Sequence, residues 1–128
     1  MKVIIIGGVA GGATTAARIR RVDEAAEIIL LEKGKYISYA NCGLPYYIGG
    51  VIEEREKLFV QTPEAFSTRF RVDVRTENEV IFIDRKRKTV TVRRSSEDTY
   101  QESYDKLLIS TGASPVHPPL PGIDLNGI

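Results

Sequence analysis

The first quarter of the chain alternates short apolar runs with a glycine-rich turn. Residues 3–6 are all β-branched, and residues 28–31 form a second apolar run that ends at Glu32. An unbroken apolar run of this length is typical of a strand buried on both faces of a parallel sheet. Between the two runs, residues 13–22 carry small residues and arginines at helical spacing. The pattern predicts a strand, a turn, a helix and a second strand parallel to the first.

Two more helices and five short strands are predicted in the rest of the chain, and the shorter helix is described below with Cys42. Thr62-Pro63-Glu64 is typical of a helix start, because it offers a capping hydroxyl, a proline at the first helical position and an acid in the first turn. This helix should run to about Arg69. The three middle strands, separated by polar turns, predict an antiparallel β-meander. The five strands are expected at residues 72–74, 79–84, 89–93, 99–103 and 107–110, and the turns of the meander at 85–88 and 95–98.

Four prolines after Ser114 indicate that the last part of the chain is a linker. They stand at positions 115, 118, 119 and 121, and His117 lies among them without a predicted role. A chain of 128 residues is long enough for one compact domain with a modest core. We therefore expect one domain over residues 1–113 and a proline-rich linker over residues 114–128.

Composition argues against several classes of function. Lys and Arg number 18 against 17 for Asp and Glu, so the formal net charge is +1 and a general polyanion binder is not expected. The basic run 85–88 fits a solvated hairpin turn better than a nucleic-acid surface. A single cysteine and a single histidine allow neither an internal disulfide nor a Cys/His metal site. No apolar run approaches the roughly 20 residues that span a membrane, and the single cysteine predicts a protein of the reducing cytoplasm.

The glycine turn after the first strand nearly matches the dinucleotide-binding pattern G-x-G-x-x-G. Gly7 and Gly12 stand at its first and last glycine positions, and Val9 replaces the middle one. A pyrophosphate bound by such a turn lies on the N-terminus of the following helix. Glu32 stands 32 − 12 = 20 positions after Gly12, where a carboxylate meets the ribose hydroxyls. Nucleotide binding is predicted, because the alternative of a purely structural glycine turn does not account for Glu32.

Five stretches of the chain carry a resemblance to one family. They are residues 7–13, 32–33, 38–50, 103–107 and 111–113, and the stretch 38–50 is highly specific. The sequence resembles the flavin-dependent pyridine nucleotide-disulfide oxidoreductases, and within them the coenzyme A-disulfide reductases and the single-cysteine NADH oxidases. A valine in the glycine turn is usual in this branch. The resemblance implies an α/β fold: a Rossmann-like FAD/NAD(P)-binding domain with a parallel sheet and an inserted antiparallel β-meander.

Members of this family are much longer than this chain. They continue into an NAD(P)H-binding domain, a second FAD-binding segment and a dimerisation domain. The resemblance therefore implies that the chain is the N-terminal FAD-binding portion of such an enzyme, with the linker leading to the NAD(P)H-binding domain. The full-length protein is expected to be a homodimer that uses FAD, NAD(P)H and coenzyme A.

The resemblance also implies two sets of contact residues. FAD contacts are implied at Gly7, Gly8, Val9, Ala10, Gly11, Gly12, Glu32, Lys33, Asn41, Cys42, Val80, Thr111, Gly112 and Ala113. Coenzyme A contacts are implied at Thr14, Arg18, Arg21, Ser38 and Asn41. Arg18 and Arg21 share one helix face, and a solvated basic face is the alternative interpretation for Arg18. Phe70 stands where the family often has a coenzyme A-binding lysine, and a neighbouring arginine, Arg69 or Arg71, is a candidate to replace it.

Cys42 is the candidate nucleophile. Tyr47 stands five positions later, where two-cysteine disulfide reductases carry their second thiol, so a redox disulfide within this chain is excluded. Cys42 is left with a mixed disulfide to a small thiol, a sulfenic acid, or no redox role. A short helix is expected over residues 43–48, with Pro45 in its first turn and Cys42 at its N-terminus, where the helix dipole favours a thiolate. A buried inert thiol is the alternative.

The family resemblance implies an NAD(P)H-dependent flavoprotein that reduces CoA disulfide, or another small disulfide, through a mixed disulfide between Cys42 and coenzyme A. One alternative keeps the flavin and changes the acceptor: an NADH oxidase or peroxidase, or a CoA-dependent polysulfide reductase, with Cys42 as a sulfenic acid or persulfide. Another alternative, from a different class, is a non-catalytic nucleotide-binding module. The isolated chain is not expected to be active, because it lacks a hydride-donor site of its own.

Overall fold

The computed structural model describes residues 1–94, 98–114 and 116–126. Its elements in chain order are β1 (Lys2–Ile6), α1 (Ala10–Val22), β2 (Glu27–Leu31), η1 (Asn41–Gly43), α2 (Leu44–Ile48), η2 (Arg55–Leu58), α3 (Pro63–Phe70), β3 (Asp73–Arg75), β4 (Glu79–Asp84), β5 (Thr89–Arg93), β6 (Thr99–Ser103) and β7 (Lys106–Ile109). Most of the turn predicted at 95–98, namely residues 95–97, lies outside the described residues.

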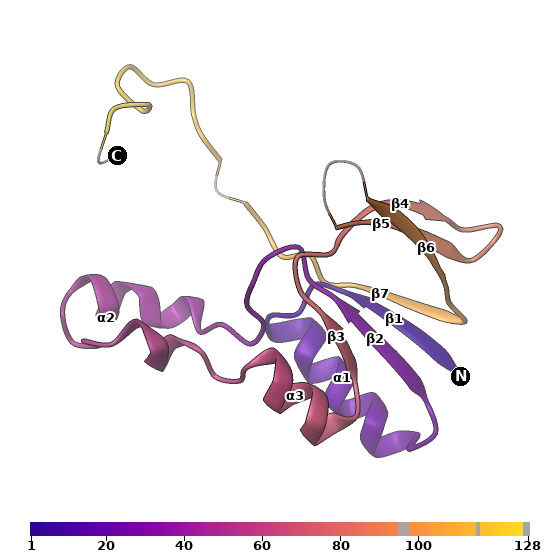
Figure 1. The fold of residues 1–128 in the computed structure, drawn as a ribbon. Helices are drawn as coiled ribbons and strands as arrows, with labels where there is room; N and C mark the ends of the chain where they lie inside the picture. The colour runs from indigo at the N-terminus through magenta and orange to yellow at the C-terminus, as the bar shows by residue number, and fades with distance from the viewer. Residues whose placement is uncertain (95–97, 115, 127–128) are drawn as a thin grey trace.

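Two sheets form the body of the molecule. The first is a parallel sheet with the strand order β3-β2-β1-β7, and the second is the antiparallel meander β4-β5-β6. Helices α1 and α3 cover one face of the parallel sheet, and the meander lies on the other side (Figure 1). The predicted fold class, a Rossmann-like α/β domain with an inserted β-meander, is confirmed.

The alternating side chains of β1 explain why its sequence is apolar at every position. Val3 and Ile5 belong to the core that the helices cover, whereas Ile4 and Ile6 belong to the core that the meander covers. All four are buried. A strand between two cores needs apolar residues on both faces, so the unbroken run indicated a doubly covered sheet.

Most element boundaries agree with those predicted from the sequence. Strands β4, β5 and β6 have the expected bounds, and the Thr62 hydroxyl accepts a hydrogen bond from the Ala65 amide (3.2 Å) at the start of α3. Helix α1 begins at Ala10, three residues earlier than expected, because Val9 already stands at its N-cap position. Strand β3 is shifted one residue toward the C-terminus and β7 one residue toward the N-terminus.

The cysteine segment, residues 38–50, differs more from its prediction. Helix α2 begins at Leu44 rather than at residue 43, and it is five residues long. Cys42 lies in the separate 3-10 turn η1, so it is not the residue at the N-terminus of the helix. Pro45 stands in the first turn of α2, as expected.

The two ends of the described chain differ in secondary structure. The N-terminal strand β1 is central in the parallel sheet, while the part after β7 contains no helix or strand among residues 110–114 and 116–126. That part runs away from the sheet in Figure 1. No helix in the described part of the chain is long and apolar enough to cross a membrane.

Candidate functional site

The glycine turn between β1 and α1 is packed so tightly that two of its positions leave no room for a side chain. A Cβ atom on Gly7, whose φ is +97°, would lie 2.1 Å from the Ser110 carbonyl oxygen. A Cβ atom on Gly12 would lie 1.8 Å from the Gly7 carbonyl oxygen. The turn therefore brings the backbone at the end of β1, the start of α1 and the end of β7 into direct contact.

The N-terminus of α1 opens beside this turn. The first amides of an α-helix have no partner within the helix, and α1 has neither an acidic side chain in its first turn nor a side-chain hydrogen bond from Val9 at its N-cap. Such a helix end, with free donors and the positive end of a helix dipole, suits an anion. The glycine pattern predicts a pyrophosphate at this point of the chain.

Glu32 lies at the end of β2 and is held by the backbone on both sides. One of its carboxylate oxygens accepts a hydrogen bond from the Gly8 amide (2.8 Å), and the other accepts one from the Gly34 amide (2.8 Å). A carboxylate can accept about four hydrogen bonds. Two acceptor positions therefore remain for hydroxyl groups, and the two backbone bonds fix the carboxylate beside the glycine turn.

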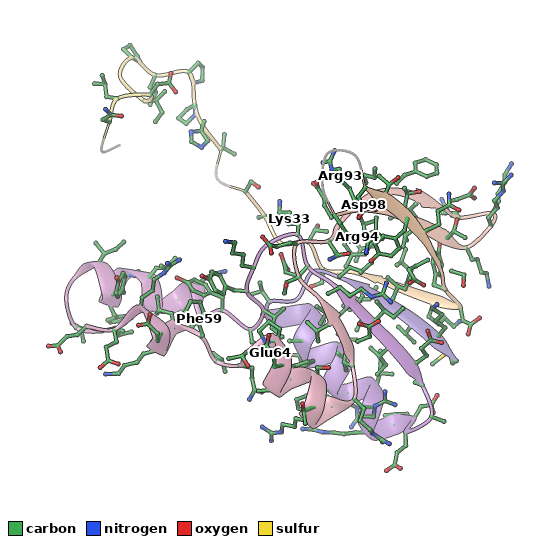
Figure 2. All side chains as sticks on the ribbon, in the orientation of Figure 1. Lys33, Phe59, Glu64, Arg93, Arg94 and Asp98 are labelled. Carbon is green, nitrogen blue, oxygen red and sulfur yellow. The ribbon has the colours of Figure 1, made fainter. Side chains whose placement is uncertain are left out.

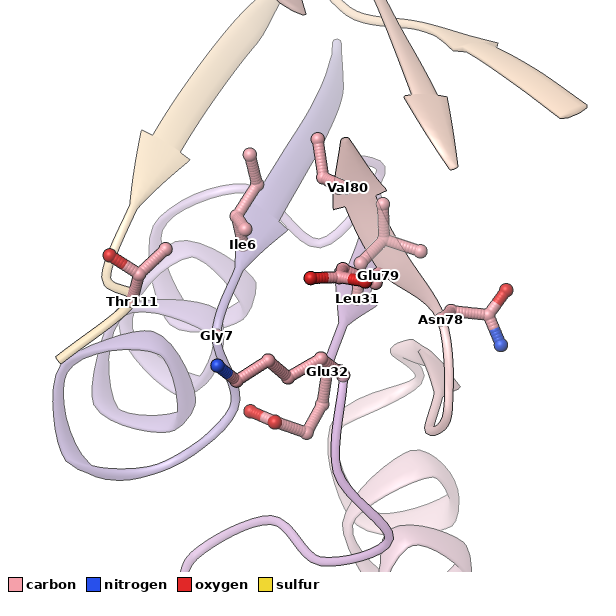
Figure 3. Close-up of a pocket in the computed structure, with 9 residues that line it drawn as sticks. Ile6, Gly7, Leu31, Glu32, Asn78, Glu79, Val80 and Thr111 are labelled. Atoms are coloured by element: carbon pink, nitrogen blue, oxygen red, sulfur yellow. The ribbon is translucent and has the colours of Figure 1, made fainter. Parts of the chain in front are cut away.

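A cavity of about 160 Å³ lies at this end of the parallel sheet (Figure 3). It is lined by Ile6, Gly7, Leu31, Glu32, Lys33, Asn78, Glu79, Val80 and Thr111. Five of these had been assigned to FAD from the sequence: Gly7, Glu32, Lys33, Val80 and Thr111. The structure thus brings together residues from β1, β2, β4 and the segment after β7.

The sequence had not indicated Asn78 and Glu79 as parts of this site. They stand directly before Val80, and the amide of Asn78 donates to the carbonyl oxygen of Glu32 (2.9 Å). The available signal was their adjacency to Val80, but their position beside Glu32 depends on how the meander folds back onto the sheet. Ile6 and Leu31 had been assigned to strands only.

A second cavity, of about 200 Å³, lies beside the start of α1. It is lined by Val9, Ala10, Ala13, Thr14, Ser38, Tyr39 and Val60. Thr14 and Ser38, both assigned to coenzyme A from the sequence, therefore share one cavity. The Ser38 amide donates to the Gly8 carbonyl oxygen (3.0 Å), and its φ of 50° is in the left-handed region that a non-glycine residue rarely adopts. This cavity lies where the glycine turn meets the start of the cysteine segment.

Cys42 is exposed, so the thiol is not buried as the alternative interpretation expected, and its redox role stays a prediction. The turn that carries Cys42 packs against the buried Leu58. A Cβ atom on Gly43 would lie 2.6 Å from a methyl group of Leu58, and the Ala40 amide donates to the Leu58 carbonyl oxygen (2.8 Å). Phe59, labelled in Figure 2, stacks its ring at 4.5 Å from the ring of Tyr36. Cys42 itself lines neither of the two cavities described above.

Several predicted site residues lie outside both cavities. Asn41 is exposed beside Cys42, and Arg18 and Arg21 are exposed on α1. Gly112 and Ala113 are exposed after β7, while Gly8, Gly11 and Gly12 form the glycine turn itself. The Phe70 ring packs at 4.7 Å from the ring of Phe66, so this position contributes to the core beneath α3.

A polar cluster, formed by Lys2, Asp73, Arg75, Tyr100 and Glu102, joins the parallel sheet to the meander. Arg75 on β3 and Lys2 on β1 donate to the two carboxylate oxygens of Glu102 on β6, at 2.7 and 2.8 Å. Burial opposes ionisation of the Glu102 carboxyl, but these hydrogen bonds outweigh it and lower its pKa. The hydrogen bond to Glu102 is also the main cause that raises the pKa of Lys2.

The family model described as pyridine nucleotide-disulphide oxidoreductase matches residues 1–128. A coenzyme A disulfide reductase from Staphylococcus epidermidis is 52% identical over 114 residues, which are 88% of this chain and 26% of that protein. This chain thus spans about a quarter of the length of that relative.

Solved structures of longer proteins contain the same fold. The crystal structure of reduced CoADR-RHD from Bacillus anthracis has a TM-score of 0.91 and 55% identity, and the match covers 95% of this chain and 22% of that one. The structure of an NAD-dependent persulfide reductase from A. fulgidus has a TM-score of 0.93 and 43% identity, with coverage of 99% and 24%. In both cases the matching part is a minor fraction of a longer chain.

Proposed function

The chain belongs to the pyridine nucleotide-disulphide oxidoreductase family, and on this premise we propose that it is the FAD-binding part of a longer NAD(P)H-dependent flavoprotein that reduces CoA disulfide. Residues 1–113 form the FAD-binding domain in this proposal, and residues 114–128 lead toward an NAD(P)H-binding domain. The full-length protein is proposed to act as a cytoplasmic homodimer.

The observation that carries the proposal is the cavity in which Gly7, Glu32 and Val80 meet. The adenosine end of FAD fits it because Glu32 keeps two acceptor positions for the ribose hydroxyls. The pyrophosphate fits the free amides at the start of α1, and the absence of a Cβ at Gly7 and Gly12 allows the tight turn and the close helix–strand packing that bring these amides beside the cavity. The residues present therefore match the group that the family membership implies.

The remaining proposed FAD contacts surround these anchors. In the proposal, the backbone of Val9 and its small neighbours faces the pyrophosphate, Val80 and Lys33 border the adenosine, and the segment after β7 lies along the cofactor. The full set comprises Gly7, Gly8, Val9, Ala10, Gly11, Gly12, Glu32, Lys33, Asn41, Cys42, Val80, Thr111, Gly112 and Ala113.

Cys42 is proposed to exchange disulfides with the substrate. Its thiolate attacks one sulfur of CoA disulfide, forms a Cys42–S–S–CoA bond and releases one CoA thiolate. Two electrons then break that bond, restore the Cys42 thiolate and release a second CoA thiolate. FAD, when bound, supplies the transfer of these two electrons from NAD(P)H. Overall, one NAD(P)H and one proton convert one CoA disulfide into two CoA thiols.

Coenzyme A is proposed to lie along α1 and the cysteine segment. Thr14 and Ser38 line the cavity between these two parts. Arg18 and Arg21 are exposed on the same helix, and planar guanidinium groups suit phosphates geometrically. Asn41, next to the thiol, completes the proposed set.

Reconstitution of the full-length protein with FAD tests the proposal. We expect NADH- or NADPH-dependent release of two CoA thiols per CoA disulfide, and a loss of turnover of at least about a hundredfold in Cys42→Ser, because serine is a poor nucleophile without a neighbouring base. The FAD content of Cys42→Ser is measured in parallel and turnover is expressed per bound FAD, so that loss of the thiol chemistry is separated from any loss of the cofactor. Full turnover in Cys42→Ser would contradict the proposed role of the thiol.

A second candidate function changes the acceptor. The likeness to an NAD-dependent persulfide reductase favours a persulfide or polysulfide as substrate, with Cys42 carrying the sulfur. Release of sulfide instead of CoA thiol, measured on the same reconstituted protein, would support this candidate. NADH consumption matched by oxygen uptake would instead indicate an oxidase, and FAD binding without any turnover would indicate a non-catalytic nucleotide-binding module.

A further inference from the structure

The cavity at the end of the parallel sheet has walls from two separate sheets. Gly7 and Glu32 follow strands of the parallel sheet, whereas Glu79 and Val80 belong to β4 of the meander. The width of the cavity therefore depends on how the start of β4 is held against the end of β2. Asn78 occupies this junction, immediately before β4.

Asn78 is held by three hydrogen bonds with different partners. Its backbone amide donates to the Glu32 carbonyl oxygen (2.9 Å), and its side-chain amide donates to the Thr76 carbonyl oxygen (2.7 Å). Its side-chain oxygen accepts a hydrogen bond from the hydroxyl of Tyr100 on β6 (2.8 Å). In Figure 3 the Asn78 side chain points away from Glu32, so it lies on the outer side of the cavity wall.

The direction of the Tyr100 hydrogen bond is fixed by Arg75. A guanidinium can only donate, and one of its nitrogens lies 3.1 Å from the Tyr100 hydroxyl oxygen. The single hydroxyl proton is thereby left for the oxygen of Asn78. Arg75 is itself held by Glu102 (2.7 Å) and Asp73 (2.9 Å). The polar cluster thus sets which way the Asn78 amide faces.

We propose that Tyr100 is a positioning residue for the adenosine end of the cavity, acting through Asn78. The inference rests on the proposed function, because it concerns the same FAD-binding cavity. The Tyr100 hydroxyl holds Asn78, Asn78 holds the start of β4 against Glu32, and the wall formed by Glu79 and Val80 is thereby kept at the distance that the adenosine needs. Tyr100 itself is not among the residues that line this cavity.

The test measures FAD affinity in the full-length apoprotein by flavin fluorescence. Tyr100→Phe removes only the hydroxyl and keeps the ring beneath the guanidinium groups of Arg75 and Arg94, 5.5 and 5.0 Å from its centroid. We expect FAD to bind about fivefold more weakly, which corresponds to one hydrogen bond. Tyr104→Phe is the matched control, because Tyr104 packs against the same core beneath the meander and lines no part of the cavity; its FAD affinity should stay unchanged.

A double-mutant cycle separates positioning from a general loss of structure. If Tyr100 acts through Asn78, Tyr100→Phe should weaken FAD binding less than about twofold further in the Asn78→Ala background. An equal loss in both backgrounds would overturn the inference, as would equal FAD affinities of Tyr100→Phe and Tyr104→Phe. Failure of the wild-type protein to bind FAD would instead overturn the proposed function, so the two failures are distinguishable.

Discussion

The cavity proposed for FAD and the cysteine segment are built in opposite ways. The cavity lies at the ends of buried strands, and its glycine turn is packed so closely that a single Cβ atom would collide with the backbone. The cysteine segment consists of short turns and a five-residue helix, and Cys42 is exposed. The cavity is thus shaped from within the domain, whereas the thiol is presented on its surface.

The apolar side chains of the two regions also differ in how far they are exposed. Ile4 and Leu30, in the strands that lead to the cavity, are both 0% exposed, whereas Ile48 and Val51, around the end of α2, are 81% and 75% exposed. Changes near the cavity therefore affect packing and cofactor binding together. Changes near the thiol are expected to affect chemistry while leaving the fold intact. Matched substitutions in the two regions test this contrast, because they should affect stability and FAD binding unequally.

The largest difference is expected between two glycines. Gly12→Ala places a Cβ atom 1.8 Å from a backbone oxygen, so we expect FAD binding to be lost and the free energy of unfolding to fall by about 3 kcal/mol or more. Gly50→Ala, in the cysteine segment, places its Cβ in open space at a φ of +77° and should cost about 1 kcal/mol. Chemical denaturation and the bound flavin content measure both. Similar losses in the two variants would remove the contrast.

A smaller difference is expected between two glutamates. Glu32→Gln keeps one acceptor oxygen but removes the negative charge, so FAD should bind about tenfold to a hundredfold more weakly. Glu53→Gln, an exposed position after α2, changes the net charge by the same amount and should leave FAD affinity unchanged. Titration of the full-length apoprotein with FAD compares the two. Equal affinities would show that Glu32 does not hold the ribose.

The smallest expected effect is on the pH dependence of the free energy of unfolding, through Glu102 on strand β6 of the meander. Because the pKa of Glu102 lies below its ordinary value of 4.5 in the folded protein, the unfolded chain takes up a proton first as the pH falls. The stabilisation by Glu102 is therefore present above about pH 4.5 and is lost as the pH falls through the lower folded pKa. Lys2 behaves in the opposite sense: its pKa is raised, so its contribution is present below about pH 10.5 and is lost as the pH rises through the folded value.

Denaturant titrations of the wild type and Glu102→Gln check this prediction. The difference in unfolding free energy between the two proteins should be nearly constant between about pH 5 and 9 and should shrink toward pH 3. A difference that stays constant down to pH 3 would contradict the role of the Glu102 charge. Cys42→Ser, in the other region, should show the same pH profile as the wild type.

The sequence was sufficient to predict the parts of the fold that depend on local patterns. The apolar run 3–6 predicted a doubly covered strand because each face of β1 meets a separate core. The strands of the meander were predicted with their correct bounds because polar turns separate them. Glu32 could be assigned because its spacing from the glycine turn follows from the length of α1 and β2.

The parts that were missed depend on contacts between distant residues. The strand order that places β7 beside β1 has no local signal, and neither does the position of Asn78 beside Glu32. The start of α2 was predicted one residue too early because Gly43 packs against Leu58, which follows fifteen positions later along the chain (58 − 43 = 15). The roles assigned to Cys42 and the coenzyme A contacts stay predictions.

The pairing of β1 with β7 has a consequence for the order of events during synthesis. The Lys2 amide donates to Asp105, 103 positions later, and the glycine turn is closed by the Ser110 carbonyl. At about 5–20 residues per second, β1 and β2 leave the ribosome several seconds before β7 does. During that interval one edge of β1 has no strand beside it, and edges of this kind favour aggregation. A nascent chain is therefore most in need of a chaperone before Ser110 emerges, and the glycine turn can close only afterwards.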